Sequence, residues 1–260
     1  MDKEKLKNMA KDKNYISGIY NYCDQWCERC PQTSRCLNYQ MGEEEFADPE
    51  TRDINNEAFW NKMSEVMRTT MEMLYEMAES MDIDIDSLEI DIDREKENEE
   101  LSENHETCRM AREYSDKVAD WLEGAGDIIS ETGYGLTVAD MNTPENGSVS
   151  DAMEVIQWYQ HQIFVKLMRA VSGLMDEPLT DDKGNQYASD SDGSAKVALI
   201  GIDRSIAAWG SMNRMFPGIG SNEIKEILIY LGSLRKAVEN TFPNARSFIR
   251  PGFDTYDLNS

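Results

Sequence analysis

Long apolar runs are missing from this chain. No stretch approaches the roughly 18 apolar residues that a membrane span requires. The charged N-terminus, MDKEKLKNMAKDKNYISGIY, also lacks the apolar centre of a secretory signal peptide. These absences predict a protein without a membrane segment, which we expect to be soluble and cytoplasmic.

Basic residues are scarce. The sequence has 26 lysines and arginines against 50 aspartates and glutamates, a formal net charge of −24 over 260 residues. A chain this acidic repels phosphate backbones, so nucleic-acid binding is not expected. A partner attracted by charge would be a basic protein.

Histidine is almost absent, and this bears on metal chemistry. A carboxylate-bridged di-iron bundle requires a Glu-x-x-His step on each of two helices. Ser102 stands three residues before His105, and Trp158 stands three residues before His161. The spacing therefore disfavours a ferritin-type oxidase.

Strand signals are scarce as well, whereas helical periodicity is common. In residues 57–81, apolar side chains recur every three or four residues and predict one buried stripe. The stripe comprises Phe59, Met63, Val66, Met67, Thr70, Leu74, Met77 and Met81. Further helices are predicted at 104–123, 149–176, 188–216 and 221–241, with the third and fourth of the five at the centre.

The predicted architecture is all-α: a bundle of four or five main helices at residues 51–260 with an irregular C-terminal tail. The acidic stretch 82–106 and the stretch 125–148 are interpreted as linkers. Residues 1–50 are predicted to form a small cysteine-rich, metal-binding element.

Four of the five cysteines lie within 14 residues, at Cys23, Cys27, Cys30 and Cys36. Their spacing is C-x3-C-x2-C-x5-C, and thiolates are natural ligands for zinc and for iron–sulfur clusters. We therefore predict a four-cysteine site. Cys108 is distant in the sequence and is not expected to belong to it.

Three chemistries remain open for this site. An iron–sulfur cluster, of the 4Fe–4S type, is favoured because such clusters often gather several cysteines in one run. A structural zinc ion is the alternative, although only one C-x2-C knuckle is present. Thiols with redox or disulfide roles are the third reading.

Two resemblances involve these residues. Cys23, Cys27 and Cys30 match the C-x3-C-x2-C run of radical enzymes that use S-adenosylmethionine. Cys27, Cys30 and Cys36 resemble the C-x2-C-x5-C run of their auxiliary clusters. Those enzymes need a βα barrel, which a helical chain lacks. The stretch YISGIYNYCDQWCERCPQTSRC is also similar to the start of uncharacterised bacterial proteins, a resemblance that implies no activity.

A second candidate site consists of Glu154, His161 and Asp203, polar residues on the two most apolar predicted helices. We expect Glu154 or His161 to meet a polar partner from another helix, with Asp203, Lys196 and Arg204 as candidates. The alternative without function is that these polar side chains are paired with one another inside the bundle or face the solvent.

Three functions follow. The first is a cytoplasmic iron–sulfur protein with a redox or sensing role. The second is a helical interaction or regulatory protein with structural zinc. The third is an enzyme with a polar pocket inside the bundle.

Overall fold

The computed structural model describes residues 3–87, 91–131, 149–175, 190–215 and 221–254. Helices and short 3₁₀ turns make up these ranges, which contain no β-strand, so the all-α class is confirmed. The helices are α1 (Lys3–Lys11), α2 (Leu37–Glu45), α3 (Glu57–Ser80), α4 (Ile92–Asn104), α5 (Glu106–Glu131), α6 (Val149–Met175), α7 (Asp190–Met215) and α8 (Ser221–Thr241). None of the helices in the described ranges is both long enough and apolar enough to cross a membrane.

The chain divides into two compact units, and the boundary differs from the one predicted at residue 50. The N-terminal unit comprises residues 1–92 and 250–260, and the helical-bundle unit comprises residues 93–249. The boundary lies later because α3 packs with the N-terminal residues. Its neighbours there are the turn Pro49–Arg52 and α1.

Ion pairs join α1 to α3 within the N-terminal unit. Lys3 lies 2.6 Å from a Glu72 carboxylate oxygen, and both Lys3 and Lys7 lie 3.0 Å from Glu76 oxygens. The Asn56 side chain accepts a 3.0 Å hydrogen bond from the Ala58 amide and so caps the start of α3. These contacts fix one side of α3 against the rest of the unit.

The apolar stripe predicted to be buried on α3 is instead largely exposed. Met67, Leu74, Met77 and Met81 expose between 42% and 62% of their surface. The residues of the described N-terminal unit that pack against α3 contact its other side, where Thr69 is buried. Periodicity located the apolar side of the helix correctly, but that side is not the one the unit covers.

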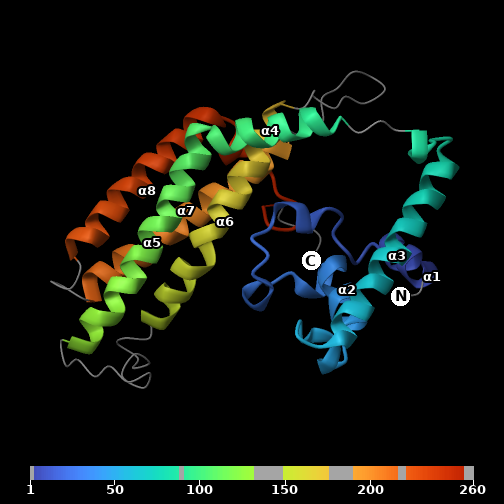
Figure 1. The fold of residues 1–260 in the computed structure, drawn as a ribbon, viewed down its shortest axis with the longest axis horizontal. Helices are drawn as coiled ribbons and strands as arrows, with labels where there is room; N and C mark the ends of the chain where they lie inside the picture. The colour runs from blue at the N-terminus through green and yellow to red at the C-terminus, as the bar shows by residue number, and fades with distance from the viewer. Residues whose placement is uncertain (1–2, 88–90, 132–148, 176–189, 216–220, 255–260) are drawn as a thin grey trace. The chain divides into compact units, whose positions relative to one another are not determined.

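The helical-bundle unit has its core between α5, α6, α7 and α8, which run side by side in Figure 1. The α6–α7 interface is the most extensive. At Gly201, an added Cβ would lie 2.8 Å from Tyr159 Cδ1 and 3.1 Å from Ile163 Cγ1. Only glycine therefore allows this close approach, and the prediction that these two helices form the centre is confirmed.

Both predicted linkers are partly helical. Residues 92–104 form α4, because Glu, Lys, Arg and Leu favour helices and Asp93 and Glu95 suit the positive end of the helix dipole. Helix α5 passes through Gly124, where nothing lies near an added Cβ, and continues to Glu131. The remainder of that linker, residues 132–148, lies outside the described residues.

The C-terminal tail also divides between the units. Phe242 and Ala245 are buried in the helical-bundle unit, whereas residues 250–254 belong to the N-terminal unit. The chain thus leaves the N-terminal unit at residue 92 and returns to it at residue 250.

Candidate metal centre

The cysteines lie on a segment of tight turns that leads into α2. Three 3₁₀ turns follow one another: η1 (Ile19–Tyr22), η2 (Cys27–Arg29) and η3 (Thr33–Arg35). The amide of Ile16 donates a 3.0 Å hydrogen bond to the Arg35 carbonyl, which closes the segment into a loop. Short turns of this kind bring side chains from separate positions to one side of the backbone.

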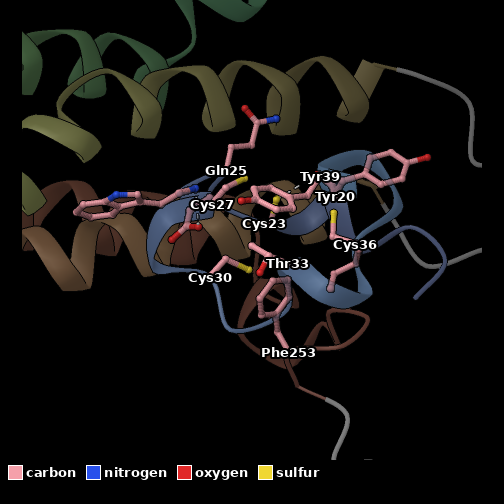
Figure 2. Close-up of a pocket in the computed structure, with 12 residues that line it drawn as sticks. Tyr20, Cys23, Gln25, Cys27, Cys30, Thr33, Cys36, Tyr39 and Phe253 are labelled. Atoms are coloured by element: carbon pink, nitrogen blue, oxygen red, sulfur yellow. Dashed lines mark hydrogen bonds between the residues drawn. The ribbon is translucent and has the colours of Figure 1, made fainter. Parts of the chain in front are cut away.

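Each cysteine occupies the end of a turn. Cys23 follows η1, Cys27 opens η2, Cys30 follows η2, and Cys36 lies between η3 and α2. All four are half-buried, and all four line one pocket in the N-terminal unit. Figure 2 shows them arranged around this space, with Thr33 and the ring of Phe253 beside them.

Backbone groups hold the central cysteines. The Cys30 amide donates to the Cys27 carbonyl at 3.1 Å, so the two residues close the tight turn expected from their spacing. The Gln32 amide then donates to Cys30 Sγ at 3.4 Å. A donor aimed at sulfur stabilises a thiolate, which is the form that binds metal.

Gln25 adopts a left-handed backbone conformation, with φ of 55°. This region is uncommon for residues other than glycine, and its occupation marks a backbone held by its surroundings. The Gln25 carbonyl accepts a 3.0 Å hydrogen bond from the Cys27 amide. The reversal at Gln25 thus sets the direction in which the chain enters η2.

The returning C-terminal segment completes the pocket, which the sequence did not predict. Gln32 Nε2 donates to the Gly252 carbonyl at 3.0 Å, and Phe253 lines the pocket. Gly252 has φ of 74°, and a Cβ there would lie 2.7 Å from Ile16. The Pro251–Gly252 pair was the available signal, because that dipeptide marks a turn.

Aromatic side chains line the pocket beside the thiols. Trp26 is buried, and the guanidinium carbon of Arg29 lies 4.2 Å from the centre of its ring. Tyr20 and Tyr39 also line the pocket. Such a lining limits water access, which influences the reduction potential and ligand basicity of a metal site.

Burial raises the pKa of the Cys27 thiol above its ordinary value, and the neighbouring Cys23, Cys30 and Cys36 raise it further. The second effect arises because thiolates this close together repel one another. A bound cation would reverse that effect, since it attracts all four sulfurs.

As the side chains stand, the described residues contain no group of three or more His, Cys, Asp or Glu that could hold a metal ion. The predicted metal-binding element is therefore not shown by the structure. The four cysteines nevertheless line one common pocket (Figure 2).

Cys108 lies apart from this pocket, in the helical-bundle unit. It is fully buried on α5, and burial raises the pKa of its thiol to about 11. A buried neutral thiol of this kind is a core residue.

In the second candidate site, His161 and Asp203 have separate polar partners. His161 is exposed on α6, and its Nδ1 lies 2.8 Å from Ser115 Oγ of α5. Asp203 pairs with Arg246 at 2.6 Å and with Arg235 at 3.5 Å. Glu154 is exposed.

A polar partner for His161 from another helix was expected and is present, but the partner is Ser115. The other candidates have different contacts: Lys196 donates to the Phe248 carbonyl, and Arg204 donates to the Tyr159 hydroxyl. His161 and Asp203 thus have different polar partners.

Comparison of the chain with protein-family models, with curated proteins and with solved structures found no match.

Proposed function

We propose that Cys23, Cys27, Cys30 and Cys36 bind an iron–sulfur cluster in the pocket they share, and that the chain has a redox or sensing role. The observation that carries the proposal is that all four cysteines, which come from the ends of separate turns, line one pocket. Four thiolates around one space form the ligand set of a 2Fe–2S or 4Fe–4S cluster.

The arrangement of the thiols favours a cluster over a single zinc ion. Four sulfurs bound to one zinc each lie about 2.3 Å from the same point. In a 4Fe–4S cluster each thiolate binds a different iron, so the sulfurs stand further apart. Both sites would use the same four thiols, and the cluster is favoured because the cysteines lie in one run, at the ends of three consecutive turns.

The surroundings of the thiols are also appropriate for electron transfer. Trp26, Tyr39 and Phe253 provide an apolar wall, and the Gln32 amide donates to Cys30 Sγ. Solvent exclusion and hydrogen bonds to sulfur are two of the factors that set cluster potentials. The acidic surface favours a basic protein as the electron-transfer partner, and a reducing cytoplasm would keep the thiols available for iron.

Structural zinc is the alternative, in which the chain would be a helical interaction or regulatory protein. The closed Cys27–Cys30 turn, with its 3.1 Å hydrogen bond, supports this reading because zinc knuckles use the same two-residue spacing. The two proposals predict a different colour, metal content and sulfide content for the purified protein.

Replacing any one of the four cysteines with serine should remove most of the bound iron. The chain would be purified without oxygen and then assayed for visible absorption, iron and acid-labile sulfide. We expect a brown protein with about four irons per chain, and loss of at least about 90% of that iron in Cys27→Ser, because serine is a poor substitute for a soft thiolate ligand.

Cys108→Ser is the matched control and should keep the iron content of the unsubstituted chain. The zinc alternative would be established by a colourless protein that holds one zinc ion per chain and loses that ion in Cys27→Ser. A chain whose metal content is the same with all four cysteines replaced would contradict both.

Cluster assembly should become more complete as the pH rises from about 6.5 to about 8.5. Cys27 must lose its proton to bind iron, and burial raises the pKa of that thiol. A higher pH lowers the free-energy cost of that deprotonation. Iron bound after reconstitution at a fixed sub-saturating iron concentration measures the effect, and a flat or falling profile would be inconsistent with thiolate ligation.

A further inference from the structure

One side of α3 exposes large apolar side chains. Their exposed fractions range from 42% to 62%, and they are Trp60, Met67, Met71, Leu74 and, just beyond the helix end, Met81. The ion pairs to α1 involve Glu72 and Glu76 on another side of the helix. The apolar side therefore differs from the side of α3 (Figure 1) that α1 contacts.

The spacing of these residues is that of a coiled-coil seam. Counted along α3, they fall on positions separated alternately by four and three residues. The seven positions are Trp60, Ser64, Met67, Met71, Leu74, Ala78 and Met81, which we call the α3 seam. A repeat of this kind presents a stripe that fits a second helix by knobs-into-holes packing.

The flanks of the α3 seam are nearly uncharged. On one side lie Asn61, Arg68 and Tyr75, and on the other lie Met63, Thr70 and Met77. Arg68 is the only charged residue among them, although the chain carries a net charge of −24. A second copy of the chain could therefore approach this stripe with the two Arg68 side chains as the only like charges on its flanks.

The sizes of the seam residues indicate the orientation of the partner helix. Ser64, Met71 and Ala78 occupy one of the two heptad positions, which therefore contains both small residues of the seam, the serine and the alanine. The other position is bulky throughout, with Trp60, Met67, Leu74 and Met81. In an antiparallel pair each position packs against the other kind, so small residues face large ones and the layers interdigitate.

Ala78 is the one seam residue that its own chain covers. It is 7% exposed, and the Ile83 amide donates to its carbonyl at 2.9 Å, where the chain turns back after α3. The open part of the seam therefore runs from Trp60 to Leu74, about 21 Å of helix. One antiparallel register places Ser64 opposite the partner's Leu74 and Met67 opposite the partner's Met71.

Trp60 is held in position at the N-terminal end of the open part of the seam. Its indole N–H donates to the Ile54 carbonyl at 2.9 Å, and its ring meets Phe59 edge-on at 5.1 Å between ring centres. It nevertheless remains 55% exposed. A fixed aromatic side chain loses little conformational entropy on association, and tryptophan is enriched at the energetic centres of interfaces.

We propose that two copies of this chain associate through their α3 seams, antiparallel and with two-fold symmetry. A symmetric interface of this kind is self-complementary, so each seam residue meets its counterpart twice. The proposal does not depend on which metal the cysteines bind, provided that the N-terminal unit is folded.

Sedimentation equilibrium of the full-length chain in reducing buffer tests the proposal, because reductant prevents disulfide-linked dimers. The unsubstituted chain should be a dimer. Met71→Glu should weaken dimerisation by about a hundredfold or more, since it places two carboxylates in the seam without partners. Met67→Glu should act in the same way, and circular dichroism checks that both variants remain helical.

Ile229→Glu is the control, because Ile229 is an equally apolar side chain, 72% exposed, on α8 of the other unit. It should leave the dimer unchanged. A photo-cross-linking residue at Asn61 should join the partner chain near Tyr75. A monomeric unsubstituted chain, a cross-link outside α3 or a parallel cross-link near residue 61 of the partner would each overturn the proposal.

Discussion

Removal of the proposed iron–sulfur cluster should unfold the N-terminal unit and leave the helical-bundle unit folded. Among the described residues of the N-terminal unit, only four apolar side chains are buried: Leu6, Ile19, Trp26 and Ala78. A core this small does not stabilise a unit of its length, and small domains of this kind commonly depend on a metal. The free energy of metal binding is then part of the free energy of folding.

Hydrogen exchange followed by mass spectrometry measures this effect in each unit separately. After chelation of the iron, amide exchange in α1, α2 and residues 13–36 should accelerate by at least about a hundredfold, equivalent to about 2.7 kcal/mol. Exchange in α6 and α7 should stay the same. Unchanged protection in the N-terminal unit would show that the apolar contacts and ion pairs stabilise it without metal.

The pH dependence of the metal-free unit follows from the same thiols. Burial raises the pKa of Cys27 in the folded state, so the unfolded chain releases that proton at a lower pH. Folding of the metal-free unit therefore becomes still less favourable as the pH rises above the ordinary pKa of a thiol.

Local periodicity was sufficient to predict most of the helices. The α8 range, 221–241, was predicted at both ends, because an apolar face and a following proline mark it clearly. Helix α4 was missed because its acidic composition suggested a solvated linker, although its residues favour helix. Periodicity identifies an apolar side of a helix but does not show what covers it, which is why α3 was predicted to be buried.

The candidate metal centre was predictable only in part, for a similar reason. The spacing of Cys23, Cys27, Cys30 and Cys36 selected the cysteines, and the structure places them around one pocket. The contribution of Phe253 could not be predicted, because it depends on the return of the chain more than 200 residues later, at the Gln32–Gly252 hydrogen bond. Contacts between residues so distant in the sequence leave no local pattern.

Trp209→Ala should produce the largest loss of stability in the helical-bundle unit. The indole is fully buried on α7 and packs edge-on against Trp121, with 4.9 Å between ring centres. Its N–H donates to the Tyr114 hydroxyl at 3.2 Å. Truncation leaves a cavity and removes a partner from a buried hydroxyl, so we expect a cost of about 3–5 kcal/mol.

A loss of this size is a large share of the about 5–15 kcal/mol that stabilises a typical domain. A denaturant titration in which hydrogen exchange is monitored in α5–α8 measures this loss of stability. Trp209→Phe should cost less, because it keeps most of the ring volume and loses only the N–H donor. Trp60→Ala is the matched control, because Trp60 is 55% exposed and lies in the other unit. In this variant the bundle should unfold at the same denaturant concentration as in the unsubstituted chain. If Trp60→Ala lowered that concentration as much as Trp209→Ala does, the two units would not unfold independently.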